Sequence, residues 1–198
     1  MNPSCVLTPE QVEGPYFIDT GFERIDITEG SAGIPLRVQL GVVDVSGCAP
    51  MEGAVVELWH ADASGAYSGF DESQGNLSDQ TEETFLRGYQ TTGANGMVEF
   101  QTVYPGWYPG RTPHFHVLAL MGDNRLVATQ LYFDDALIDR VYQQEPYAAR
   151  GARDTTNADD DVSRIGGASG TGPLLLDVVE GDPGDVGSFV LGVGSFPD

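Results

Sequence analysis

Two of the three histidines in this 198-residue chain, His114 and His116, are separated by a single residue. In a β-strand, residues two apart point to the same face, about 6–7 Å apart along the backbone, so both imidazoles would project together. Such a pair offers a metal ion two adjacent nitrogen ligands. The alternative is two histidines at partly exposed strand positions. The spacing favours a metal site without identifying the metal.

The choice of metal depends on what completes the ligand set. No acid follows the histidine pair closely, because Val117 to Met121 are all apolar. His60 would create a three-histidine zinc site, but beside Trp59 on a strand it is typical of a buried core histidine. The remaining donors are the phenols of Tyr108 and Tyr67. Two phenolates favour Fe(III) over Zn(II), whereas the alternative for both tyrosines is ordinary loop packing.

Two further polar features lie near this group in the sequence. Arg111 precedes the histidine pair by three residues, where a guanidinium could stabilise negative charge developing on a substrate. Its alternative is a surface salt bridge, since the chain has 30 acidic residues. The acids of the stretch NADDD, residues 157–161, are predicted to form a solvated loop rather than a calcium site.

The sequence predicts that short strands position these residues. Period-two alternation or apolar runs bounded by turns predict eight strands, and one short helix is expected at 135–147. The predicted strands cover 35–45, 53–62, 85–92, 96–104, 114–121, 125–133, 172–181 and 187–196. This pattern predicts an all-β fold, a two-sheet β-sandwich with long loops.

The sequence shows no internal repeat and no linker dividing two folding units. We therefore expect residues 1–198 to form a single domain. Residues 1–34 are rich in turn formers and predict an irregular N-terminal arm. The polar, glycine-rich stretch 151–172 predicts a loop.

Composition limits the range of partners. All nine basic residues are arginine, and with 30 acidic residues the formal net charge is −21. Such a surface repels nucleic-acid phosphates and anionic membranes, so we expect neither as a partner. No apolar run approaches the roughly 20 residues of a membrane-spanning helix. We expect a monomer or a small homo-oligomer.

The chain contains two cysteines, Cys5 and Cys48. A disulfide between them would tie the N-terminal arm to a turn and contribute roughly 4 kcal/mol by loop-closure entropy. The alternative is two free thiols in a reducing compartment. No secretory signal follows Met1 in the printed sequence.

Six stretches, taken together and in order, resemble the intradiol ring-cleavage dioxygenases, non-haem Fe(III) enzymes that include the catechol and protocatechuate dioxygenases. They cover about residues 5–150. The stretches are LTPEQVEGPYF (7–17), PLRVQLGVVD (35–44), GAVVELWHADASGAYSG (53–69), TFLRGYQTT (84–92), YPGWYPGRTPHFHV (104–117) and TQLYFDD (129–135).

The resemblance implies a role for each matching residue. The four implied Fe(III) ligands are Tyr67, Tyr108, His114 and His116. Arg111 is similar in position to the family's arginine beside the substrate, and Gln130 to its active-site glutamine. Tyr16, within EGPYF, matches a segment that lines the substrate mouth in related enzymes.

The implied reaction is cleavage of a catechol between its two hydroxylated carbons with O2, giving a cis,cis-muconate-type product. A bound catechol would displace Tyr108, which would then serve as a base, while Tyr67 remains bound. Candidate substrates are catechol, hydroxyquinol and protocatechuate. The net charge of −21 favours neutral catechols.

The chain departs from the larger catechol dioxygenases because it lacks their N-terminal helical region, which leaves its oligomeric state open and suggests a more open pocket. The cysteine pair and the polar tail are similar to a smaller, exported subgroup, which implies an extracellular or periplasmic location. The rival interpretation is a secreted β-sandwich binding module with a degenerate or structural metal site.

Overall fold

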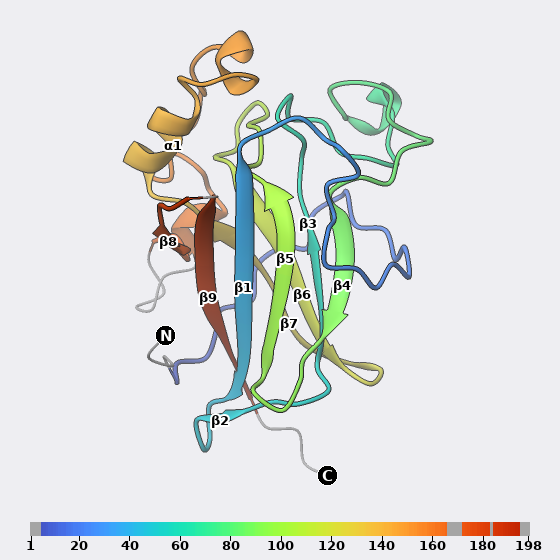
Figure 1. Ribbon diagram of the computed structural model, residues 1–198, viewed down its shortest axis with the longest axis vertical. Coiled ribbons are helices and arrows are strands. Elements are labelled where there is room, and N and C mark those ends of the chain that lie inside the picture. Colours follow the sequence, from blue (N-terminus) through green and yellow to red (C-terminus); the bar gives the residue numbers. More distant parts are fainter. Residues whose placement is uncertain (1–4, 166–171, 183, 195–198) are drawn as a thin grey trace.

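Two β-sheets pack face to face in the computed structural model, which describes residues 5–165, 172–182 and 184–194 (Figure 1). The larger sheet is centred on β1 (Pro35–Asp44), which pairs antiparallel with β2 (Ala49–Pro50) and β5 (Met97–Val103). On its other side β1 runs parallel to β9 (Asp185–Val193), and β9 pairs with β8 (Asp177–Val179). Strands from near both ends of the chain therefore lie side by side.

The smaller sheet has four antiparallel strands and carries the candidate site. Its order is β4 (Arg87–Thr91), β3 (Val55–Trp59), β6 (His114–Met121) and β7 (Asn124–Tyr132). The long connections leave this sheet and the neighbouring one at the upper end of Figure 1. The two-sheet sandwich predicted from the strand pattern is confirmed.

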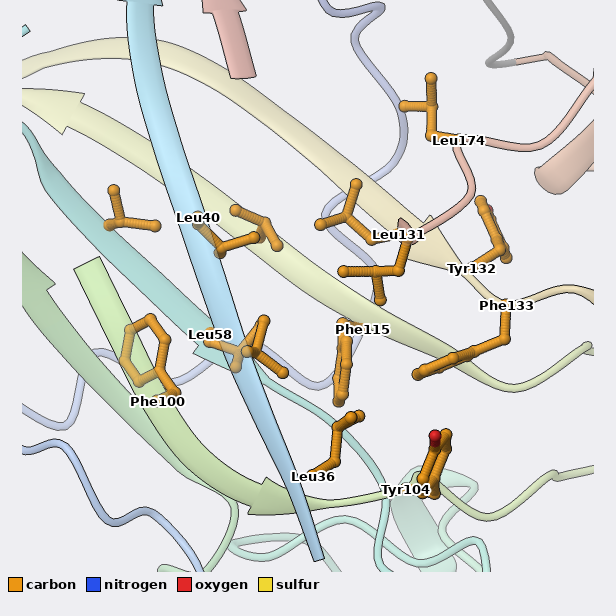
Figure 2. Packing of buried hydrophobic residues seen from close by; sticks show 14 of the residues in the cluster. Leu36, Leu40, Leu58, Phe100, Tyr104, Phe115, Leu131, Tyr132, Phe133 and Leu174 are labelled. Carbon is orange, nitrogen blue, oxygen red and sulfur yellow. The ribbon is translucent and has the colours of Figure 1, made fainter. Parts of the chain in front are cut away.

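The main core lies between the two sheets. Leu36 and Leu40 of β1 face Leu58 of β3 and Phe115 of β6 across the gap, and all four are at most 2% exposed (Figure 2). Because side chains alternate along a strand, the neighbours of these residues point to the outer faces. A second apolar cluster covers the outer face of the smaller sheet.

The predicted helix at 135–147 begins where the observed helix begins but is longer than it. The α-helix α1 covers Asp135–Val141 and is capped by Asp134, whose side chain accepts from the N–H groups of Ala136 and Leu137. Pro146 has no N–H with which to continue the helical ladder. The chain instead forms the 3-10 helix η2 (Tyr147–Arg150). Two further 3-10 turns are η1 (Glu72–Gln74) and η3 (Ser163–Ile165).

The strand predicted at 172–181 is wrong over most of its length, because only Asp177–Val179 form β8. Leu174 and Leu176 bond instead to the end of β7, through the backbone of Tyr132. The last predicted strand extends to residue 196, and residues 195–196 lie outside the described part. Residues 166–171 of the predicted polar loop also lie outside it.

The N-terminal arm is held without forming a strand of its own. Residues 5–34 make isolated backbone bridges, including Glu23 to Tyr89 of β4. Cys5 and Cys48 form a disulfide, with 5.4 Å between their Cα atoms, as the cysteine pair predicted. None of the helices in the described residues has the length and apolar character needed to cross a bilayer.

Candidate metal centre

His114 and His116 both lie on the outer face of the smaller sheet. Phe115 and Val117, the residues that alternate with them on β6, belong to the core between the sheets, whereas Leu118 belongs to the outer cluster. The loop end of this sheet is nevertheless well covered, because His114 is 2% and His116 1% exposed. The alternation predicted from the histidine spacing therefore places both imidazoles in one buried group.

Four donor atoms from four side chains converge at this point. The two histidine Nε2 atoms are 3.1 Å apart. Tyr67 Oη lies 3.1 Å from Nε2 of His116, and Tyr108 Oη lies 3.3 Å from Nε2 of His114. Donors about 2.1 Å from one ion and 90° to 109° apart would be separated by about 3.0–3.4 Å. The arrangement fits a single metal ion held by two nitrogens and two oxygens.

The hydrogen bonds of His114 fix which nitrogen faces this centre. Its Nδ1 lies 2.7 Å from the carbonyl oxygen of Thr112, which can only accept, so Nδ1 carries the proton. The lone pair on Nε2 then points toward the other donors. Burial lowers the pKa of His114 and of His116 well below the usual histidine value. Both rings are therefore neutral, as metal ligands must be.

The ring of His116 is fixed by packing from both sides. Trp59, opposite it on β3, stacks on it with ring centroids 5.0 Å apart and an interplanar angle of 9°. From the arm, Gly14 approaches so closely that a Cβ there would lie 2.8 Å from His116 Cε1. The arm therefore acts as a cover for this imidazole.

Tyr67 lies in a loop that Asn76 locks. The Asn76 side chain accepts from Tyr67 N–H at 2.9 Å and donates to the Tyr67 carbonyl at 2.8 Å. Burial raises the pKa of the Tyr67 phenol well above its ordinary value, against the opposing charges of Arg111 and Arg87. A phenolate in this position requires a strong cation beside it, which a highly charged metal ion supplies.

Tyr108 is held less firmly than Tyr67. It is partly exposed, whereas Tyr67 is 1% exposed. Its loop is fixed at the ends, since Gly106 N–H donates to the Asp62 carbonyl at 2.9 Å and Gly110 N–H to Asp154 Oδ1 at 3.3 Å. Burial raises the pKa of the Tyr108 phenol, and the neighbouring Arg111 works against that rise. Part of the Tyr108 side chain is therefore open to solvent while its loop is fixed at both ends.

Arg111 links three polar groups next to the centre. Its Nε donates to Asp160 Oδ2 at 2.8 Å and its Nη1 to Tyr108 Oη at 3.3 Å, while Nη2 bonds Gln130 Oε1. Burial opposes its charge, but Tyr108 and Asp160 outweigh burial and raise the pKa of Arg111. The cation is thus fixed beside the donor set.

The prediction of a solvated loop at 157–161 is wrong for Asp160. Its carboxylate is fully buried. Besides the bond from Arg111, it accepts from the N–H groups of Thr112, Val162 and Ser163. These bonds satisfy an anion that burial alone would disfavour. The loop folds inward and supplies the counter-charge to Arg111.

Gln130 lies opposite His116 on β7 and is also fully buried. Its amide nitrogen donates to the Val12 carbonyl at 2.8 Å, and its Oε1 accepts from Tyr132 Oη at 3.0 Å as well as from Arg111. This network fixes the orientation of the amide. Gln130 therefore helps to fix the position of Arg111, because its oriented Oε1 accepts from Nη2 of the arginine.

Tyr16 covers the centre from the arm. Its ring stacks on that of Tyr67, with centroids 4.4 Å apart, and its hydroxyl donates to the Gly75 carbonyl at 2.8 Å. Tyr16 and Tyr108 line a cavity of about 180 Å³ together with Leu77. This cavity gives a small molecule access to Tyr108.

His60 lies apart from this group, which confirms its interpretation as a core histidine. Its Nδ1 is bonded to the Ala61 carbonyl at 2.8 Å and its Nε2 to Thr102 Oγ1 at 2.7 Å. Burial lowers the pKa of His60 to about 3. Within the described residues no group of three His, Cys, Asp or Glu side chains is placed to hold a metal, so a three-histidine zinc site is excluded there.

Three residues that support the centre were missed by the sequence reasoning: Asp160, Asn76 and Arg87. Arg87 is 2% exposed and donates to the Tyr16 carbonyl at 2.7 Å and the Ser68 carbonyl at 2.7 Å. Arg87 is the one charged residue in the stretch TFLRGYQTT, a predicted strand, and this could have indicated a buried, functionally placed arginine. Asp160 and Asn76 lie in polar loops, where nothing local distinguishes them.

Comparisons with known proteins show which family this chain is similar to. Residues 12–163 match the model of a dioxygenase family. A catechol 1,2-dioxygenase of Acinetobacter lwoffii is 40% identical over 106 residues, which cover 51% of this chain and 32% of that protein. The protocatechuate 3,4-dioxygenase beta chain of Burkholderia cepacia is 36% identical over 145 residues, covering 63% and 59%. The matched stretches thus span between about a third and three fifths of these curated relatives.

Solved structures give longer matches. An intradiol ring-cleavage dioxygenase from Tetranychus urticae superposes with a TM-score of 0.85 and 34% identity, covering 96% of this chain and 95% of that one. The dioxygenase domain of a carbohydrate-binding fusion protein from Streptomyces sp. SirexAA-E gives a TM-score of 0.67 and 33% identity, covering 93% and 96%.

Proposed function

We propose a function for this chain, which belongs to the intradiol ring-cleavage dioxygenase family. The proposed reaction is cleavage of a catechol-type ring between its two hydroxylated carbons with O2. The product would be of the cis,cis-muconate type, and the role would lie in aromatic compound catabolism. The observation that carries this proposal is the chain of four donors in which each phenol oxygen lies 3.1 or 3.3 Å from one imidazole nitrogen and the two imidazole nitrogens lie 3.1 Å apart.

The cofactor we propose is non-haem Fe(III), which this family generally uses. The proposed ligands are Tyr67, Tyr108, His114 and His116. Phenolate is a hard, anionic ligand. Two phenolates, with a combined charge of −2, stabilise a trivalent ion such as Fe(III) more than a divalent ion. A bound Fe(III) ion would supply a Lewis acid that the two catecholate oxygens could chelate, which would draw electron density from the ring and activate it toward O2.

We propose that Tyr108 is first a metal ligand and then, once displaced, a base. It is the less buried of the two phenols, so its movement opens the least packed side of the centre. The freed phenolate accepts a proton from a catechol hydroxyl, and Arg111 Nη1, 3.3 Å from the phenol oxygen, stabilises the anion until then. Tyr67, stacked beneath Tyr16, stays in place.

Arg111 is proposed to contact the substrate, and Gln130 to position Arg111. The arginine sits beside the donor set with 18% of its side chain exposed, so part of the guanidinium remains open to a ligand. Gln130 bonds Arg111 from the buried side. Tyr16, which lines the cavity of about 180 Å³, would contact the ring of the bound catechol.

We further propose that residues 1–198 form a single domain and that the protein works in an oxidising compartment outside the cytosol. The Cys5–Cys48 disulfide supports that location, because such bonds persist mainly where thiols are oxidised.

The test is oxygen uptake over a panel of neutral and acidic catechols, with metal analysis of the same sample. We expect one iron per chain, a red colour from phenolate-to-iron charge transfer and uptake of one O2 per ring cleaved. A colourless protein with stoichiometric zinc, or an iron protein that consumes no O2 with any catechol, would favour the rival binding module.

A further inference from the structure

Arg150, at the end of η2, is unlike the other eight arginines. Each of those donates a hydrogen bond or forms an ion pair, whereas Arg150 makes neither with any residue in the described ranges. Its guanidinium instead lies over the ring of Trp107, 4.4 Å from the centroid. The chain has more than three acids for every arginine. A guanidinium left without a carboxylate in such a protein is available to a ligand.

Arg150 lines a cavity of about 460 Å³ on the loop end of the molecule. The two acids in its wall are already engaged. Glu29 accepts from Arg24 and from Thr84 Oγ1, and Asp62 Oδ1 accepts from the Ser64 and Ala66 N–H groups. Asp62 forms no ion pair, but like Glu29 it accepts hydrogen bonds, whereas Arg150 is the one charged group lining the cavity that makes no hydrogen bond within the described residues.

The rest of the wall is largely apolar. Ala63, Phe85 and Ala149 contribute to it, and Ser31 adds a hydroxyl group. A guanidinium stacked on an aromatic ring keeps its N–H groups free at its edge, where they match the two oxygens of a carboxylate. The cavity thus suits a carboxylate carried on a short apolar chain.

This cavity adjoins the one beside the proposed reacting centre. Gly65, packed against the Trp107 carbonyl, separates them: a Cβ there would lie 2.1 Å from that oxygen, 2.4 Å from Arg150 Nη1 and 3.0 Å from Leu77 Cδ1. Gly65 and Leu77 both line the smaller cavity with Tyr108. Trp107, on which Arg150 stacks, immediately precedes Tyr108 in the chain. The unpaired guanidinium is therefore placed at the rim of the space that a catechol ring would occupy.

We infer that Arg150 binds a carboxylate of the substrate, so that the preferred substrate is a catechol bearing an acidic side chain. The ring occupies the smaller cavity beside Tyr108, and the acid points toward Gly65 and Leu77, next to which Nη1 of Arg150 lies. This inference rests on the proposed function. It also revises the expectation of a neutral catechol, which came from net charge alone.

The net charge does not oppose this assignment at short range. Exposed charges farther than about 8 Å away are largely screened at physiological ionic strength. Burial lowers the pKa of Arg150, and the acids Asp62 and Asp154 act against that effect by their charge without bonding to the arginine. Asp154 is itself occupied, since it accepts from Gly110 N–H and Thr155 Oγ1. Among the described residues no anion forms a hydrogen bond with the guanidinium, so a bound carboxylate would meet no competitor there.

The kinetic test compares dihydrocaffeate, a catechol with a propanoate chain, with its neutral methyl ester. For the iron-loaded full chain we expect kcat/KM to favour the acid, and Arg150→Gln to reduce the acid-to-ester ratio by about tenfold or more. Arg140→Gln removes the same charge from the exposed surface of α1 and should leave the ratio as it is. Equal ratios in the two variants, or no preference in the unmodified protein, would overturn the inference.

A binding test separates this inference from the proposed function. Phenylpropanoate lacks the catechol hydroxyls, so its affinity for the metal-free full chain, measured by calorimetry, needs no turnover. We expect Arg150→Gln to weaken that binding by about tenfold relative to Arg140→Gln, and Arg150→Lys to weaken it less, because it keeps the charge. If no catechol is consumed but these affinities differ as stated, the proposed function fails and the carboxylate site stands. Identical affinities reject the site.

Discussion

Asp160 holds Arg111 from its buried side: Oδ2 of the aspartate lies 2.8 Å from Nε of the arginine, and the carboxylate has no exposed surface. The two residues are 49 positions apart in the chain. The pair directs the other guanidinium nitrogens toward Tyr108 and Gln130. The loop that sequence composition marks as solvent-exposed thus determines where the cation beside the donor set points.

Asp160→Asn should slow turnover without disturbing the metal. The amide keeps the shape but loses the charge-assisted bond, so we expect kcat/KM for a catechol to fall by about tenfold to a hundredfold. The visible absorption of the iron form should stay unchanged, since none of the four donors is altered. Asp161→Asn, one residue along with its side chain 88% exposed, is the control. An equal loss in both variants would contradict the positioning role.

Tyr67→Phe and Tyr108→Phe should have different consequences. Tyr67 is buried under Tyr16 with its backbone locked, so its loss should lower iron affinity by about tenfold or more. Tyr108→Phe should retain more iron but bind catechol more slowly, because it removes the proposed base. Both should weaken the red charge-transfer band. Tyr89→Phe, on β4, removes a hydroxyl elsewhere and should change neither iron content nor colour; indistinguishable results for all three would count against the assignment.

The histidine pair was predictable because its geometry is local: two residues on one strand share a face whatever the rest of the chain does. Gln130 depends on a detail that the sequence conceals. Met121 pairs with Asn124 at the hairpin turn, but a bulge between Ala119 and Leu120 shifts the register. Without that shift Gln130 would lie opposite Phe115 and face the sandwich core. Only the folded hairpin shows that it faces the donor set.

Contacts made by loop residues explain the other misses. The bond that Arg111 donates to Asp160 joins segments 49 residues apart, whereas the bonds between Asn76 and Tyr67 lie within one loop, and both loops have the composition of any solvated segment. The family resemblance supplied the four donors and Arg111, since motif spacing is preserved along the chain. It also supplied Gln130, which bonds Arg111, but it did not supply Asp160 or Asn76, because these two lie outside the matching stretches and their contacts are set by how the loops pack.

Glu57→Gln should stabilise the protein at high pH and have little effect at low pH. Burial, with the nearby acids Asp19 and Glu13, raises the pKa of Glu57 to about 7 from 4.5. The cost of ionising it in the folded state is therefore fully present above pH 7 and disappears as pH falls toward 4.5. Urea unfolding at pH 8 and pH 5 measures the difference. Glu52→Gln, at an exposed turn position, is the control; a gain for Glu57→Gln that is equal at both pH values would contradict this reading.

Gly14→Ala should disturb the metal centre from outside it. Gly14 has φ of 83°, and an added Cβ would lie 2.8 Å from Cε1 of His116, closer than such atoms normally approach. Because Trp59 stacks on the imidazole, the ring cannot retreat toward β3, so either the arm lifts or Nε2 leaves the other donors. We expect iron affinity to fall by about tenfold, by analogy with the loss of a residue that orients a ligand.

Gly21→Ala separates this effect from backbone strain. Gly21 has a similar φ of 63°, but a Cβ there meets nothing within 4 Å. Both variants should lose about 1 kcal/mol of stability from the left-handed backbone conformation, measured by urea unfolding of the metal-free protein. Only Gly14→Ala should also lose iron and the red band. If Gly21→Ala loses as much iron, strain in the arm is responsible and the contact with His116 is not; if neither loses iron, the arm does not hold this imidazole in place.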